Sequence, residues 1–379
     1  MAHRFWWAIP LALYIWATLQ VSFIGASSLH ILRDLSTDYD ISGYAILFNQ
    51  GSSWGDLVSL WDGQWYRSIV EWGYQVNYSL EEGISKGYLT NWAFFPLYPT
   101  IIGVITGLEI PFWLAGSAIS ITCSLVGIII IFRVAYTHSK SLWLSTFSIV
   151  TILASPSFFI MQSTYTEGVS ILLLALVLYG LTSKKYLFAL IGIVLIGFTR
   201  GLGIPLLALI IGYLAFEFYK TKKFPKSSLF LLPAAIFAAV FWPLFVGYNL
   251  GSLTASLDLL TLWTTAEKYP LWVPLLAVIS VFLLQFKMKL PWEWKLWSLI
   301  YIVYITVTTV MSTGLIRYAM LALIPVPLFF SKLKPKHKAI ANGMLLFIIF
   351  MVGAYAQLWW FTSVWIPTST EARWSYSIP

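Results

Sequence analysis

The chain has 379 residues, of which 59% are hydrophobic, 18% are aromatic and only 10% are charged. A soluble domain has about 25% charged residues, so this composition excludes a water-soluble globule and predicts an all-α, polytopic membrane protein. The net charge of +8 comes from short Lys and Arg clusters between apolar runs, which is how membrane topology is encoded and not how nucleic acid is bound. We interpret residues 1–379 as a single membrane domain.

Cysteine and histidine give no indication of a disulfide or metal centre. The single cysteine, Cys123, lies inside an apolar run and has no partner. The histidines are scattered without ligand spacing, at His3, His30, His138 and His337.

The first predicted element is an uncleaved membrane helix from Phe5 to about Ala26. It is longer than the apolar core of a signal peptide, which has roughly 7 to 15 residues, and it follows Arg4, so its N-terminus should be cytoplasmic. Residues 27–91 then form a polar first external loop, far longer than the usual connection of about 4 to 6 residues. Its carboxylates are Asp34, Asp38, Asp40, Asp56, Asp62, Glu71, Glu81 and Glu82. Loops of this length are usually functional.

The segment 61–74 within this loop predicts an interfacial helix. It opens with the sequence WDGQWY, and aromatic or apolar residues recur at helical spacing at Trp61, Trp65, Ile69 and Trp72. Asp62 stands at the start of the helix, where a carboxylate can meet both water-soluble and lipid-borne reactants. The competing interpretation is an aromatic anchor with a solvated Asp62.

A proline-punctuated run at 93–107 follows and is short enough to be re-entrant. Ten further apolar runs come after it, at roughly 112–134, 142–160, 167–182, 186–199, 203–219, 229–248, 271–287, 296–313, 315–330 and 339–361. If 93–107 does not cross the membrane, 16 of the 23 basic residues lie inside; if it crosses, 18 lie outside. The positive-inside rule favours the first threading, which predicts about 11 spans with a re-entrant segment.

This threading places the isolated ionisable residues Asp62, Glu167, Arg200 and Arg317 on one, non-cytoplasmic, face. Glu167 either completes a capping box with Thr164 or binds a sugar hydroxyl. Arg200 and Arg317 either extend to the membrane interface or bind a lipid phosphate, because guanidinium groups hold phosphate bidentately without metal.

These motifs together resemble a known family. The 61–74 segment, the Phe94–Pro99 run, the Ser155–Glu167 stretch and the Thr199–Gly203 turn occur in the order seen in PIG-V-type mannosyltransferases, which are similar to the second mannosyltransferase of GPI-anchor assembly and have a GT-C type fold. The eukaryotic branch commonly has a histidine in the first motif. This chain has Gln64 and Trp65 there, as prokaryotic relatives tend to.

The resemblance implies a multi-pass enzyme of the cell membrane that transfers a sugar from a polyprenyl-phosphate donor to a glycolipid, glycan or protein acceptor, with mannose as the expected sugar. It implies transfer with inversion on the non-cytoplasmic face, with Asp62 as the catalytic base. The expected substrate-binding residues are Trp61, Gln64, Trp65, Tyr66, Glu167, Arg200, Arg317 and Tyr318. Metal dependence stays open: the sequence contains no histidine cluster, and the loop carboxylates offer weak binding of a divalent cation.

Two other functions fit the composition. A secondary transporter or lipid-linked-sugar flippase would be equally apolar, but such proteins tend to show internal repeats and ionisable groups near the middle of their spans, and neither is evident in the sequence. A noncatalytic subunit of a larger membrane complex is the third interpretation, and it requires that Asp62 be dispensable.

Overall fold

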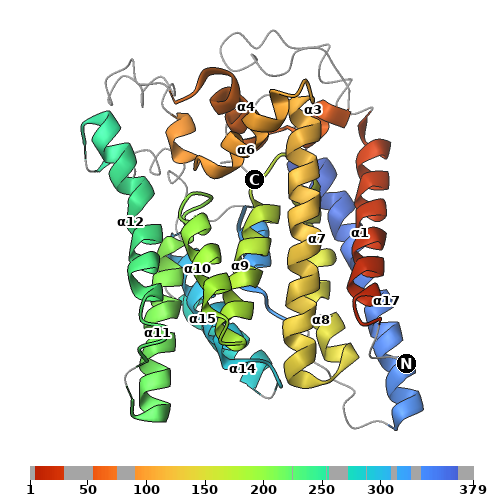
Figure 1. Ribbon diagram of the computed structural model, residues 1–379. Coiled ribbons are helices and arrows are strands. Elements are labelled where there is room, and N and C mark those ends of the chain that lie inside the picture. Colours follow the sequence, from red (N-terminus) through yellow and green to blue (C-terminus); the bar gives the residue numbers. More distant parts are fainter. Residues whose placement is uncertain are drawn as a thin grey trace.

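In the computed structural model the chain folds as a bundle of helices capped at one end by short helices (Figure 1). The structure describes residues 5–29, 54–74, 90–223, 225–252, 254–255, 272–286, 288–308, 314–325 and 334–365. These ranges contain helices and no strand, which confirms the all-α class.

Five helices in the described part of the chain are long and apolar enough to cross a membrane. They are α1 (Ala8–Ser27), α7 (Phe112–Ser139), α11 (Gly203–Thr221), α12 (Leu231–Leu250) and α17 (Pro335–Trp360). A helix rises about 1.5 Å per residue, so about 20 residues span the ~30 Å hydrocarbon layer. The protein is therefore a helical protein embedded in a membrane.

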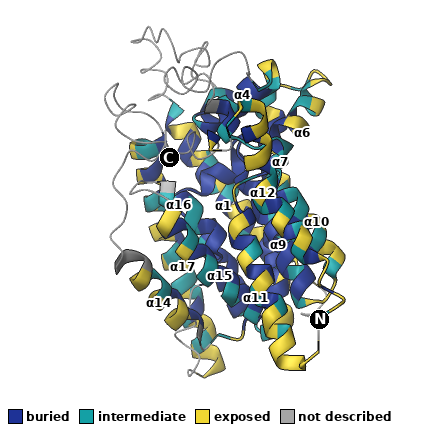
Figure 2. Cartoon of the chain, turned by 90° about the vertical axis from the view of Figure 1, so that its left-hand side faces the viewer, coloured by how far each residue is buried: buried dark blue, intermediate teal, exposed yellow. Residues whose placement is uncertain are grey.

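Shorter helices complete the bundle, and two of them are largely buried. They are α8 (Leu142–Leu153), α9 (Glu167–Thr182), α10 (Tyr186–Ile196), α14 (Trp272–Phe286) and α15 (Trp292–Thr308). Figure 2 shows α9 largely buried and α11 with long exposed stretches. The backbone of α9 approaches α7 closely at Gly168, where an added Cβ would lie 2.3 Å from the Ser120 carbonyl oxygen. Small residues of this kind let helices pack closely in membranes.

One end of the bundle, which we call the basic end, collects lysine-rich connections. Lys184, between α9 and α10, lies 3.4 Å from the carboxylate of Glu217 near the end of α11. Tyr186 at the start of α10 contacts Tyr213, whose ring stacks on Trp292 at the start of α15. The α7–α8 connection and the start of α17 lie at this same end (Figure 1). Helices that follow one another in the chain across these connections, such as α7 and α8 or α9 and α10, consequently run in opposite directions.

The opposite end, which we call the site end, carries the short helices α3 (Trp54–Val58), α4 (Asp62–Trp72) and α6 (Leu97–Thr106), with a 3-10 turn η2 (Thr90–Ala93) between α4 and α6 (Figure 1). The ten residues of α6 extend about 15 Å, half of a hydrocarbon layer. This helix packs against α4 and α7 and does not run the length of the bundle.

Two predicted spans are not single continuous helices. Within 142–160, α8 ends at Leu153 and a 3-10 turn η3 (Phe158–Gln162) follows, because the residue before Pro156 is disfavoured in helical conformation. Within 315–330, the described residues form α16 (Gly314–Ala319) and a 3-10 turn η4 (Met320–Ala322), which ends at Leu323 with a left-handed φ of 52°. The helix α3 has no counterpart among the predicted elements.

Candidate active site

The four isolated ionisable residues meet at the site end in one group, which we call the ion cluster. Arg317 lies at its centre: its Nη2 donates to Asp62 Oδ2 at 2.6 Å, and its Nε lies 2.5 Å from Glu167 Oε1. Arg200 Nη1 lies 2.5 Å from the same Glu167 oxygen. The cluster thus joins four positions that are far apart in the sequence, each at or near the end of a helix.

All four side chains are shielded from solvent. The exposed fraction is 0% for Glu167, 7% for Asp62, 6% for Arg317 and 14% for Arg200. Two carboxylates and two guanidinium groups balance in charge, which is the condition for burying ions, because an unpaired buried charge costs several kcal/mol. Arg200 is the most exposed member and forms the solvent-facing edge of the cluster.

Aromatic rings cover the guanidinium groups. The Tyr318 ring centroid lies 4.8 Å from the guanidinium carbon of Arg200 and 5.0 Å from that of Arg317. The Tyr165 centroid lies 5.2 Å from the guanidinium carbon of Arg317. Cations attracted to ring faces in this way are held more strongly when water is excluded. Tyr318, a predicted site residue, therefore contacts the cluster.

Asp62 is the first residue of α4, and its backbone N–H donates to the Tyr165 hydroxyl at 3.1 Å. Burial raises the pKa of the Asp62 carboxyl above its ordinary value, and the Arg317 guanidinium acts against this rise. The preceding residue, Trp61, has φ 57° and ψ −114°, a conformation that a non-glycine residue rarely adopts. Such strain persists only where surrounding contacts impose it.

Tyr66 contacts the proline-containing run that begins at Phe94, and so links this run to the site. Its hydroxyl donates to Thr166 Oγ1 at 3.3 Å, and its ring meets those of Phe94 and Tyr98 edge to face. Trp65 stacks on Phe94 with centroids 6.3 Å apart. The two motifs therefore form one packed unit beside the ion cluster.

Gln64 is half-buried on the same helix. Its backbone N–H donates to the Trp61 carbonyl at 3.0 Å, which closes the first turn of α4. Trp61 and Trp65 belong to the same segment, and their side chains contact Trp365 and Phe94.

The capping-box interpretation of Glu167 is wrong. The residue that precedes α9 is Thr166, with no side-chain cap, and the Thr164 hydroxyl donates to the Val58 carbonyl at 3.1 Å instead of capping the helix. The Glu167 carboxylate faces the two arginines. The charged partners of Glu167 lie far away in the sequence, so a local sequence pattern could not reveal them.

The interpretation of Asp62 as a solvated residue of an aromatic anchor is also wrong. The inward face of α4 carries Asp62, Tyr66 and Ile69, all buried. The predicted aromatic stripe is divided: Ile69 is buried, whereas Trp72 is 52% exposed. The buried face of α4 is therefore rotated by about one residue from the predicted aromatic stripe.

The donor set does not fit a metal at the cluster. Asp62 Oδ2 and Glu167 Oε1 are both held by guanidinium groups, which occupy the positions that a cation would take. No group of three or more His, Cys, Asp or Glu side chains with ligand geometry occurs among the residues that the structure describes. The predicted loop carboxylates Asp34, Asp38, Asp40, Glu81 and Glu82 lie outside the described residues.

Two aromatic residues of the site were not predicted. Tyr165 bonds the backbone of the corner between α3 and α4, accepting from Asp62 N–H and donating to the Leu60 carbonyl. Trp365, at the end of η5 (Phe361–Trp365), bonds the same corner from the last helix. Tyr165 stands two residues before Glu167 and is detectable by that proximity, whereas nothing in the spacing of Trp365 points to residue 61.

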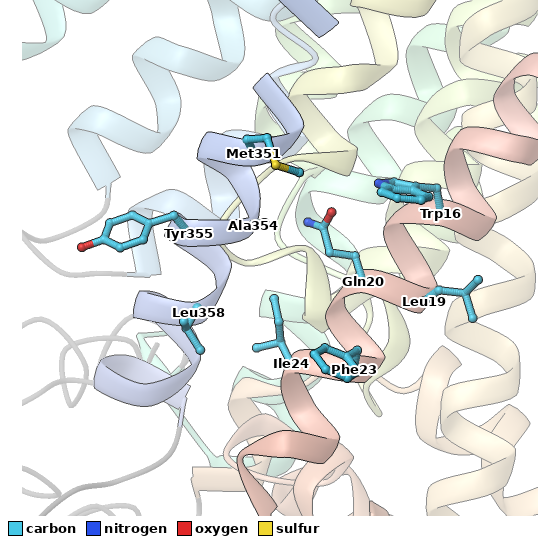
Figure 3. A pocket seen from close by; sticks show the side chains of 9 residues that line it. All are labelled: Trp16, Leu19, Gln20, Phe23, Ile24, Met351, Ala354, Tyr355 and Leu358. Atoms are coloured by element: carbon cyan, nitrogen blue, oxygen red, sulfur yellow. The ribbon is translucent and has the colours of Figure 1, made fainter. Parts of the chain in front are cut away.

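A cavity of about 560 Å³ lies elsewhere, between α1 and α17 (Figure 3). Its lining is apolar apart from Gln20, and it includes Trp16, Phe23, Met351 and Leu358. None of its lining residues belongs to the ion cluster. This cavity is a groove between two membrane helices, separate from the ion cluster.

The fold and site together define an all-helical membrane protein with a buried, charge-balanced cluster at one end of its bundle. Comparisons with protein-family models, with curated proteins and with solved structures find no match to this chain.

Proposed function

We propose that the ion cluster is the active site of a GT-C type membrane glycosyltransferase of the PIG-V kind. It transfers a sugar, mannose in the resembling family, from a polyprenyl-phosphate donor to an acceptor hydroxyl. The observation that carries this proposal is the direct contact of Asp62 with Arg317, because it places a carboxylate beside a phosphate-binding group at the end of a membrane bundle.

In the proposed reaction, Asp62 accepts the proton of the acceptor hydroxyl as its oxygen bonds to the anomeric carbon. The bond from that carbon to the phosphate oxygen breaks, and its electron pair leaves with polyprenyl phosphate. A single displacement inverts the anomeric centre. Arg317 and Arg200 stabilise the charge that develops on the phosphate. The raised pKa of Asp62 makes its carboxylate a better base.

Arg317 links the proposed base to the proposed phosphate-binding group. Its guanidinium holds both Asp62 and Glu167, so a donor phosphate that binds Arg317 competes directly with Asp62. Binding of the donor then frees the Asp62 carboxylate to accept a proton, while Glu167 keeps Arg317 and Arg200 in place. The base becomes available when the leaving group is bound.

The proposed topology has eleven spans, a re-entrant α6 and the ion cluster on the non-cytoplasmic face. It is supported by the separation of the lysine-rich connections from the ion cluster, at opposite ends of the bundle (Figure 1). The short α6 supports it too, because about 15 Å is half of the length needed to cross.

The rival function is a transporter or lipid-linked-sugar flippase. Transporters hold their ionisable groups near the bilayer midplane. Here Glu167 is the first residue of α9 and Asp62 the first residue of α4, so the cluster lies at helix ends. This position favours a reaction at the membrane surface over passage through the bundle.

Sugar transfer by the purified protein in detergent tests the proposal, because transport has no meaning there. The protein is incubated with polyprenyl-phosphate mannose and a membrane extract, and the product is identified by mass spectrometry. Asp62→Asn should lower turnover roughly 10²-fold or more, the range for losing a general base. Glu217→Gln at the basic end is the control and should keep turnover.

Transfer by wild type that persists in Asp62→Asn would assign the base elsewhere. Absence of transfer in detergent, together with flux of a lipid-linked sugar across vesicles containing the protein, would favour the flippase. A stable Asp62→Asn protein that supports the function of a larger membrane complex would favour the noncatalytic subunit.

A further inference from the structure

The corner between α3 and α4, residues 57–62, leads to the proposed base and is held by hydrogen bonds from distant parts of the chain to its backbone. The α3 helix has only five residues, so its last carbonyls lack the partners that a longer helix would supply. The Val58 carbonyl accepts from Thr164 N–H at 2.9 Å, and the Leu60 carbonyl accepts from the Tyr165 hydroxyl at 3.1 Å. The segment before α9 thus holds the middle of the corner.

The end of the last helix holds the rest of the corner. Trp365 Nε1 donates to the Leu57 carbonyl at 3.0 Å, and Trp61 Nε1 donates to the Trp365 carbonyl at 2.7 Å. Trp365 alone thereby forms hydrogen bonds with residues near both ends of the corner. These two hydrogen bonds fix the backbone just before Asp62.

Trp365 is itself firmly placed. It is fully buried, and its ring packs against those of Tyr165, Phe159 and Trp360 at centroid distances of 5.4, 5.4 and 5.3 Å. Further down α17, Gln357 donates to the carbonyl of Ser155 at 3.1 Å and accepts from Gln20 at 2.7 Å. The end of α17 is therefore a fixed support for the α3–α4 corner.

Trp61 shows why a support is needed. Its φ of 57° is unfavourable for a residue with a side chain, so the corner would relax if its bonds were removed. Relaxation at residue 61 would move the first residue of α4, which is Asp62. The indole bond from Trp61 to Trp365 acts on the strained residue itself.

We propose that Trp365 is a positioning residue, which sets the Asp62 carboxylate for proton transfer through its hydrogen bonds to Leu57 and Trp61. The inference rests on the proposed function for its kinetic part only. Trp365 acts through the backbone of the corner.

The test compares Trp365→Phe with Trp360→Phe. Both tryptophans are fully buried and lie near the end of α17, but the Trp360 indole nitrogen has no hydrogen-bond partner. The two substitutions remove the same atoms, and only one removes a bond to the corner. Thermal unfolding of both variants reports the shared loss of packing.

We expect kcat for sugar transfer to fall about 10-fold or more in Trp365→Phe, with the donor KM changed less than about twofold, because small misplacement of a reacting group lowers the chemical step. Trp360→Phe should keep kcat within about twofold. A structural role alone would lower the amount of active protein in both variants and leave kcat per folded molecule unchanged.

Hydrogen exchange of the peptide 57–66 supplies a second measurement that needs no activity. It should be faster in Trp365→Phe than in wild type and unchanged in Trp360→Phe. Equal exchange in the two variants, or equal kcat, overturns the inference. If wild type transfers no sugar but exchange separates the variants, the proposed function fails and the support of the corner by Trp365 stands.

Discussion

At the site end, Arg317 and Arg200 are buried against Asp62 and Glu167, whereas at the basic end Lys184 meets Glu217 with 65% of its side chain exposed. Both ends therefore contain ion pairs between basic and acidic residues. The arginine pairs lie at 2.5 to 2.6 Å and the lysine pair at 3.4 Å.

The difference between these ends shows how environment decides what a charge does. An exposed lysine keeps most of its water, so an ion pair such as Lys184–Glu217 contributes little to stability. The buried arginines have exchanged water for carboxylates and ring faces, and each depends on the others. Only the second arrangement joins charged groups from several helices into one buried cluster.

The largest effect should come from removing the central cation. Arg317→Met leaves Asp62 and Glu167 buried without their shared partner, and we expect the free energy of unfolding to fall by about 3 to 5 kcal/mol. Lys184→Met is the matched change at the basic end and should cost about 0 to 1 kcal/mol. Thermal unfolding in detergent measures both, and equal losses would contradict the comparison.

Glu167→Gln should have the next largest effect. The substitution keeps the shape but loses the charge that both arginines share, so the free energy of unfolding should fall by about 1 to 3 kcal/mol. The two guanidinium groups then repel each other, and donor binding should weaken more than turnover. If the residue were only a helix cap, glutamine would replace it with no change in donor affinity.

The pH dependence of turnover should distinguish the buried carboxyl from an exposed one. Burial raises the pKa of Asp62, so turnover should fall on acidification at a pH above the ordinary carboxyl value of about 4. Below its pKa, Asp62 is protonated and cannot accept a proton. Above its pKa, the carboxylate can act as the base. The residual activity of Asp62→Asn should lack this acidic limb, and a limb below pH 4 in wild type would contradict the assignment.

The smallest effect on the protein, and the sharpest test of sidedness, comes from cysteine labelling. Trp72 at the site end and Lys222 at the basic end are both exposed, so Trp72→Cys and Lys222→Cys, in a Cys123→Ala background, should fold and react. An impermeant reagent added outside intact cells should label position 72 and not position 222. The opposite pattern would invert the proposed topology.

Much of the bundle is predictable from sequence because apolar runs are a local property. The run at 167–182 coincides with α9, and the helix at 61–74 begins at Asp62, where it was predicted. The wrong predictions occur where one local sequence pattern conflicts with another or with a distant contact. Pro156 ends α8 early, and the pattern at Thr164 and Glu167 imitates a capping box whose members have partners elsewhere.

The sequence by itself determined the membrane class, and its isolated charges pointed to Asp62, Glu167, Arg200 and Arg317 as candidate residues, because charged groups are rare and costly in so apolar a chain. Only the tertiary structure decided that Arg317 joins the two carboxylates and that Trp365 supports the corner before Asp62. Hydrophobic periodicity determines where helices form, but it contains no distances between residues that lie hundreds of positions apart. Those distances are set by how the helices pack.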